Sequence, residues 1–108
     1  MKNRILPLAV ALAIGVMHTL PAQALQALTG HIVVLESTYM PGSISLQLDV
    51  GNAACPAGKW LRWTAAASAE ATYSTMLAAL LANKKVNFYI DDNDTSCTGR
   101  FFHIVNQN

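Results

Sequence analysis

The chain has 108 residues with seven basic and six acidic side chains, a formal net charge of +1. This length predicts one domain with a small core. A charge so close to zero provides no basic field, so the composition argues against nucleic acid and anionic lipid as partners.

The first 24 residues have the pattern of an export signal. Two basic residues precede an apolar run over residues 5–16, and the triplet Ala-Gln-Ala at 22–24 fits the site of a signal peptidase. The run is shorter than the roughly 20 residues needed to cross a bilayer, which argues against membrane insertion. We therefore expect residues 1–24 to be a cleaved signal peptide and residues 25–108 to be a secreted or periplasmic domain with a net charge of −1.

The expected mature chain contains two cysteines, Cys55 and Cys97. An even number of cysteines in an oxidising compartment favours pairing, so we predict a disulfide between them. Its loop closure would remove roughly 4 kcal/mol of unfolded-state entropy on the chain-entropy model. Neither cysteine belongs to a C-x-x-C pair, which argues against a zinc site or a catalytic thiol.

The first half of this domain has the pattern of three strands. A β-branched stretch over 31–39 ends at Pro41-Gly42, and residues 43–50 then alternate strictly between apolar and polar side chains. Residues 59–64 predict a third strand. Its alternation sets Trp60 and Arg62 on one face and Leu61 and Trp63 on the other.

A helix and two further strands are predicted in the second half. Ser68 is the expected N-cap and Asn83 the expected left-handed C-cap. The apolar stripe of the helix is expected to consist of Tyr73, Met76, Leu77, Leu80 and Leu81. Strands are expected over 86–90 and 100–105, with a polar loop between them.

The fold class that follows is mainly β with one α-helix. The order β-β-β-α-β-β, with the helix between the third and fourth strands, is that of a five-stranded OB-fold-like barrel. An α+β sheet covered by a helix is the alternative.

The sequence offers little catalytic or metal-binding chemistry. Asp92, Asp94 and Ser96 have the spacing of a calcium loop, but Cys97 stands where that loop needs glycine. Because no nucleophile pattern accompanies the histidines, we expect no catalytic residues, no cofactor and no enzyme activity. Flat aromatic side chains beside polar donors suit sugar rings instead, which makes Trp63 and Arg62 candidates for glycan binding.

Three segments carry a resemblance to a known family: the step Thr29-Gly30 leading into an apolar strand, the helix segment 73–80, and the strand segment 85–90. They resemble the OB-fold B subunits of A-B-type bacterial toxins, closest to those of subtilase cytotoxin and the pertussis-like typhoid toxin. The resemblance implies a pentameric ring, a cell-surface glycan as ligand and a catalytic A subunit as partner. It also implies that Thr29, at a position where the family has a serine, and Tyr89 contact the sugar.

The leading functional hypothesis is thus a secreted, ring-forming glycan-binding module similar to a toxin B subunit. A monomeric periplasmic or secreted interaction protein, such as an inhibitor or envelope factor, is the alternative and predicts no ring. An oligonucleotide-binding OB domain fits less well because of the export signal and the negative charge.

Overall fold

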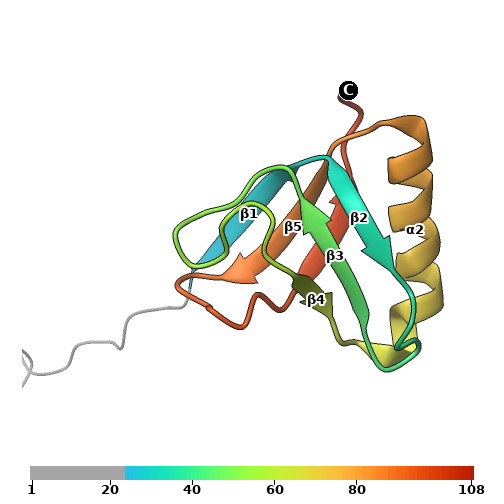
Figure 1. Cartoon of the computed structure of the whole chain (residues 1–108), viewed down its shortest axis with the longest axis horizontal. Helices are drawn as coiled ribbons and strands as arrows, with labels where there is room; N and C mark the ends of the chain where they lie inside the picture. The colour runs from blue at the N-terminus through green and yellow to red at the C-terminus, as the bar shows by residue number, and fades with distance from the viewer. Residues whose placement is uncertain (1–23) are drawn as a thin grey trace, which may run out of the picture.

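The computed structural model describes residues 24–108, so the predicted signal peptide lies outside the described residues except for Ala24. These described residues form six strands and one helical segment, and the strands make two antiparallel sheets that cross in Figure 1. The strands are β1 (Leu25–Gly30), β2 (Ile32–Glu36), β3 (Ile44–Leu48), β4 (Leu61–Trp63), β5 (Val86–Asp91) and β6 (Phe101–Ile104). The helical segment is η1 (Ala66–Ser68) followed directly by α2 (Ala69–Ala82).

One sheet has the order β1-β5-β6 and the other β2-β3-β4. The single residue His31 separates β1 from β2, so the chain passes from one sheet to the other at this point. Asp49 holds the backbone of His31 in place with two hydrogen bonds. Its carboxylate accepts a bond from the His31 N–H at 2.8 Å, and its own N–H donates to the His31 carbonyl at 3.0 Å. Glycine suits position 30, because a Cβ there would lie 2.7 Å from a methyl group of Val50 and would push that side chain aside.

The two sheets also meet at the start of β4. The Arg62 N–H donates to the Cys97 carbonyl at 3.0 Å, and the Gly99 N–H donates to the Arg62 carbonyl at 2.8 Å. These two bonds form a parallel bridge between Arg62 and Thr98, just before β6 begins. Among residues 24–108 the strands do not form a closed barrel.

The fold is mainly β with one helical segment, as predicted, but residues 24–108 form six strands where the sequence predicts five. The additional strand is β1, whose sequence LQALTG has no apolar alternation and buries only Leu28 and Gly30. It is a strand because all six of its residues pair with β5. The other five strands lie where the sequence predicts them, although each one except β5 is shorter than expected.

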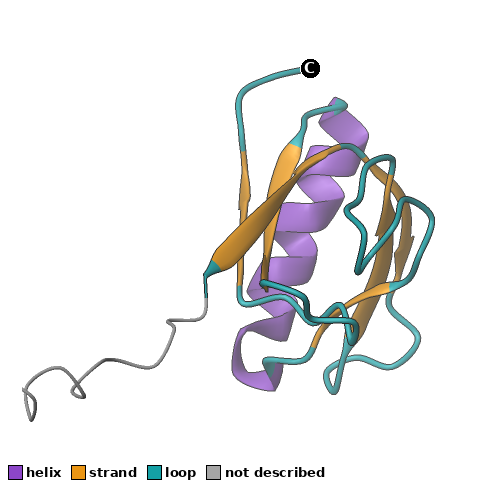
Figure 2. Cartoon of the chain, turned by 90° about the vertical axis from the view of Figure 1, so that its left-hand side faces the viewer, coloured by secondary structure: helices purple, strands orange, loops and turns teal. Residues whose placement is uncertain are grey.

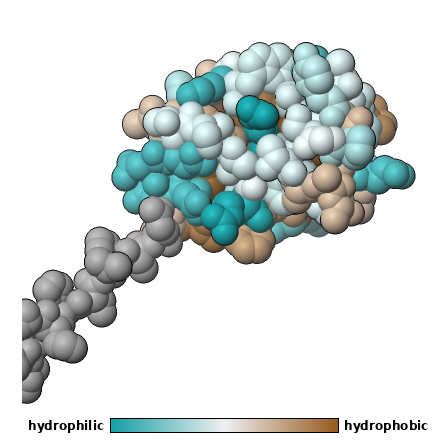
Figure 3. All heavy atoms as spheres, turned by 90° about the horizontal axis from the view of Figure 1, so that it is seen from below, coloured by the Kyte–Doolittle hydropathy of each residue, from teal (hydrophilic) through white to brown (hydrophobic). Residues whose placement is uncertain are grey.

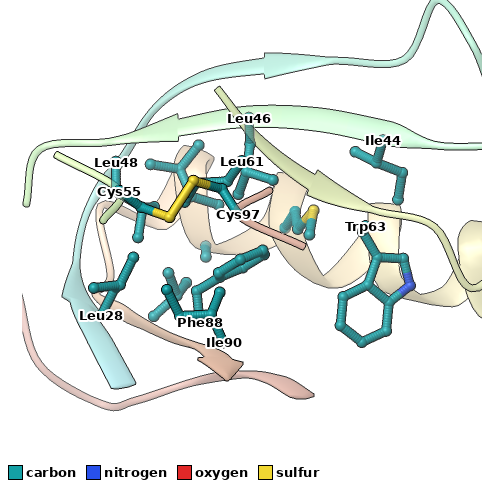
Figure 4. Close-up of a cluster of buried hydrophobic side chains, with 14 residues drawn as sticks. Leu28, Ile44, Leu46, Leu48, Cys55, Leu61, Trp63, Phe88, Ile90 and Cys97 are labelled. Carbon is teal, nitrogen blue, oxygen red and sulfur yellow. A yellow bond between two sulfur atoms is a disulfide. The ribbon is translucent and has the colours of Figure 1, made fainter. Parts of the chain in front are cut away.

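The core lies between the two sheets. Figure 4 shows Leu28, Phe88 and Ile90 of one sheet facing side chains from β3 and β4 of the other. The Cys55–Cys97 disulfide lies between these layers with both sulfurs fully buried, and its Cα atoms are 5.9 Å apart. The structure therefore confirms the predicted disulfide, a bond typical of proteins in oxidising compartments.

The helix α2 covers one side of the sheets, where it packs against β2 and β6 (Figure 2). Three of the five residues of the predicted stripe face the core: Met76 is buried, and Tyr73 and Leu80 pack against the core, whereas Leu81 is 78% exposed and Leu77 is also exposed. The prediction left out Ala69 and Ala79, which are also buried and whose small side chains let the helix approach the sheets closely. No helix within 24–108 is long and apolar enough to span a membrane.

Both predicted caps occupy their positions. Asn83 adopts the left-handed conformation with φ 55° and ψ 47°, which confirms the expected C-cap. Ser68 precedes the first residue of α2, but its hydroxyl makes no capping bond and donates instead to the Ala65 carbonyl at 3.3 Å.

Candidate functional site

The outward face of the β1-β5-β6 sheet gathers two of the four predicted glycan-binding residues. Alternation along the strands buries Leu28 and Phe88, so their neighbours Thr29, Asn87 and Tyr89 point away from the core. Cross-strand register then arranges the outward side chains in rows that run across the sheet.

The first row is polar and consists of Thr29, Asn87 and His103, which lie opposite one another on β1, β5 and β6. The Thr29 hydroxyl donates to Asn87 Oδ1 at 2.6 Å. Asn87 Nδ2 lies 2.9 Å from His103 Nε2, a donor-acceptor pair when that ring nitrogen carries no proton. This chain of bonds fixes three side chains while leaving further donors and acceptors at the surface.

The second row is aromatic. Tyr89 lies opposite Ala27 on β1 and Phe101 on β6. The Tyr89 and Phe101 rings meet edge to face with centroids 6.4 Å apart, and Phe101 is 56% exposed. The His103 ring of the polar row is 5.4 Å from the Tyr89 ring. Because Ala27 is small, the Tyr89 ring has no bulky side chain beside it on β1.

The third row is charged. Asp91 follows Tyr89 on the same face of β5, and its Oδ2 accepts a hydrogen bond from Arg100 Nη1 at 2.9 Å. The backbone N–H of Arg100 donates to the Tyr89 carbonyl at 2.7 Å, which holds the ion pair against the aromatic row. An aromatic strip is therefore flanked by polar side chains on one side and by a charged pair on the other.

The third predicted residue, Arg62, lies on the other sheet. It faces Ser45 across β3 and β4 and lines an open pocket of 590 Å³. The lining residues are Tyr39, Gly42, Ser43, Ser45, Trp60 and Arg62. Arg62 therefore belongs to a second surface site, distinct from the site at Thr29 and Tyr89.

The fourth predicted residue, Trp63, is not at the surface. Its side chain is 9% exposed and lies in the interior near Ile44 (Figure 4). The indole Nε1–H donates to the Ser68 hydroxyl at 3.3 Å, so its polar atom is also engaged. In this structure Trp63 is a core residue and presents no face to a ligand.

The loop between β5 and β6 gathers polar side chains at the end where the described chain begins. The Asp92 N–H donates to the Ala24 carbonyl at 2.8 Å, and Figure 3 shows hydrophilic atoms next to the grey trace. Hydrogen bonds from Ser96 hold the pKa of Asp94 below its ordinary value of 3.8. No group of three or more His, Cys, Asp or Glu side chains within 24–108 is placed to hold a metal ion.

The sequence did not single out most members of the two surface sites. Asn87 and His103 complete the polar row, and Phe101 extends the aromatic one. The alternation of β5 already set Asn87 and Tyr89 on opposite faces from Phe88, but the neighbours on β1 and β6 depend on register. Tyr39 joins the pocket through the turn before β3.

Comparison of the chain with protein-family models, curated proteins and solved structures gave no match.

Proposed function

We propose that this chain is an exported glycan-binding module of the toxin B-subunit kind, which binds sugar on the outward face of the β1-β5-β6 sheet. The observation that carries the proposal is the arrangement on this face of an aromatic strip between a hydrogen-bonded polar row and a charged pair.

The chemistry of a sugar ring fits this arrangement. The apolar C–H face of a pyranose stacks on an aromatic side chain, while its hydroxyls exchange hydrogen bonds with neighbouring polar groups. Tyr89 and Phe101 supply the apolar surface, with Thr29 and Asn87 on one side and Asp91 on the other. Because the polar side chains are already held by one another, binding a sugar orders few additional groups.

An OB-fold-like barrel is the fold that we propose for residues 25–108. If β1 and β2 are counted as one strand bent at His31, the order becomes β-β-β-α-β-β. The parallel bridge between Arg62 and Thr98 joins the two sheets at the opposite side. Both features are what a small, partly open five-stranded barrel requires.

Self-association into a ring is part of the same proposal. Exposed apolar side chains lie on α2 and on the two strands that it contacts, β2 and β6. These residues are Val33, Val34, Leu77, Leu81 and Ile104. Burial of such residues between identical copies is a common source of stability for small subunits. The resemblance to toxin B subunits gives five as the number of copies and a catalytic A subunit as the partner.

Glycan binding is tested with the purified, disulfide-bonded protein on a glycan array, followed by titration of the best ligand against Tyr89→Ala. We expect this substitution to weaken binding roughly tenfold or more, because it removes the stacking surface. Tyr39→Ala is the matched control, since Tyr39 is an exposed tyrosine outside the β1-β5-β6 sheet, and it should bind as the parent does. An array without bound glycan, or equal losses in both variants, would refute the glycan site.

Light scattering tests the ring separately. A mass of roughly five protomers is expected. A clean monomer would contradict the ring and favour the alternative of a monomeric secreted or periplasmic interaction protein. Because the sugar face and the apolar residues around α2 are different surfaces, either part of the proposal can fail without the other.

A further inference from the structure

The pocket on the β2-β3-β4 sheet is lined by a cation and two aromatic side chains. Arg62 points outward from β4, and its guanidinium makes no hydrogen bond or ion pair with any other residue of 24–108. No acidic residue lines the pocket. A planar guanidinium without a partner offers two parallel N–H donors, the arrangement that a carboxylate accepts best.

The aromatic residues of the pocket are exposed as well. Trp60 is 45% exposed and Tyr39 65% exposed, and both line the same 590 Å³ space as Arg62. Their flat faces suit a flat apolar body, and a volume of this size is typical of sites for small ligands.

Two hydroxyl groups complete the lining. Ser43 and Ser45 are half-buried, and Ser45 lies directly opposite Arg62 in the sheet. A hydroxyl beside a guanidinium donates a further hydrogen bond to the same oxyanion. Lys59, the nearest cation along the chain, is turned away, because its Nζ donates to the Thr95 carbonyl at 3.0 Å. Glu36 lies opposite Ser45 on β2, outside the lining, and its carboxylate accepts a hydrogen bond from the Thr38 hydroxyl at 3.2 Å. The lining itself provides one positive charge and no negative one, which favours a monoanion over a doubly charged phosphate.

From these contacts we propose that the Arg62 pocket binds a small aromatic carboxylate. The carboxylate pairs with the Arg62 guanidinium and the Ser45 hydroxyl, and the ring lies against Trp60 and Tyr39. This site is separate from the glycan face, since its residues belong to the other sheet and to the turn before β3.

The two tryptophans make the test specific. Trp60 lines the pocket, whereas Trp63 lies in the core with its N–H bonded to Ser68, so their indole N–H signals in NMR report on the two environments separately. We expect phenylacetate to shift the Trp60 signal saturably and to leave the Trp63 signal in place. Phenylacetamide, which has the ring without the charge, and acetate, which has the charge without the ring, should each bind roughly tenfold more weakly or worse.

Variants complete the experiment. Arg62→Gln should weaken phenylacetate binding by a similar factor, since only the side chain changes and the backbone bridge to Thr98 remains. Lys84→Gln, which removes a positive charge beyond the C-terminal end of α2 and outside both surface sites, should leave the affinity unchanged. The proposal is overturned if phenylacetate produces no saturable shift up to about 10 mM, a concentration that would fill roughly nine-tenths of sites with a Kd of about 1 mM. Equal affinity for phenylacetate and phenylacetamide, or unaltered binding by Arg62→Gln, would overturn it as well.

Discussion

Thr29 and Asn87 are directly opposed across β1 and β5, and the Thr29 hydroxyl donates a 2.6 Å hydrogen bond to Asn87 Oδ1. A hydroxyl has one proton to donate and two lone pairs to offer, so Thr29 keeps its acceptor capacity after this bond. The same pair thus holds the polar row together and presents an oxygen to a sugar hydroxyl.

Replacement of Thr29 by valine tests that role, because valine keeps the shape and the β propensity and removes the oxygen. We expect roughly two- to tenfold weaker binding of the glycan that the array identifies, the usual effect of one neutral hydrogen bond. Thr38→Val is the matched control: Thr38 is an exposed threonine beyond β2 whose hydroxyl bonds to Glu36. Isothermal titration calorimetry of both variants measures the effect, and equal affinity of Thr29→Val and the parent would remove Thr29 from the site.

Truncation of the two tryptophans to alanine should change the free energy of unfolding by very different amounts. Trp63→Ala leaves a cavity between the sheets and frees the Ser68 hydroxyl, so we expect a loss of about 3–5 kcal/mol in the free energy of unfolding. Trp60→Ala removes an exposed side chain and should change stability by no more than about 0.5 kcal/mol. Urea unfolding compares the two, and a small loss in Trp63→Ala would contradict its place in the core.

How far the sequence predicts the fold depends on whether a segment carries its own periodicity. Ile44, Leu46 and Leu48 alternate with polar residues, and the strand they predict is the one observed. The segment 25–30 has no such pattern and becomes a strand only through its pairing with β5. The helix lies where the sequence predicts it, and Met76 of the predicted stripe is buried. The stripe does not include Ala69 and Ala79, which are buried because close approach to the sheets favours small side chains.

The candidate sites also contain some residues that the sequence predicts and others that depend on strand pairing. Thr29 and Tyr89 were predicted from a family resemblance, and the structure brings them to one sheet face. Their neighbours His103 and Phe101 depend on the register of β6, which the sequence does not encode locally. Arg62 and Trp63 are adjacent in sequence and therefore point to opposite faces of β4, so they cannot serve one ligand together.

The disulfide should contribute strongly to stability, since it joins residues 42 positions apart in a small domain. In the chain-entropy model its removal by the double substitution Cys55→Ala and Cys97→Ala lowers the free energy of unfolding by about 4 kcal/mol. Burial of both sulfurs adds lost packing to this figure. Chemical denaturation of the oxidised parent and the double variant provides the comparison. A difference below about 1 kcal/mol would mean that the bond does not constrain the unfolded chain.

The loop between β5 and β6 should lose stability in acid through Asp94. Its carboxylate accepts bonds from the Ser96 hydroxyl at 2.6 Å and the Ser96 N–H at 2.8 Å, which lower its pKa in the folded state below the ordinary 3.8. A carboxyl whose pKa is lowered by folding stabilises the fold above its unfolded pKa, and this contribution disappears as the pH falls through the folded pKa.

We therefore expect Asp94→Asn to be less stable than the parent at pH 7, and the difference to shrink as the pH falls below 3.8. Asp92→Asn is the control, since the Asp92 side chain makes no hydrogen bond to another residue of 24–108 and its backbone bond to Ala24 survives the change. Urea unfolding at pH 7 and at acid pH measures both variants. If the Asp94→Asn difference were the same at the two pH values, the loss of stability would not come from the hydrogen bonds that the Asp94 carboxylate accepts from Ser96.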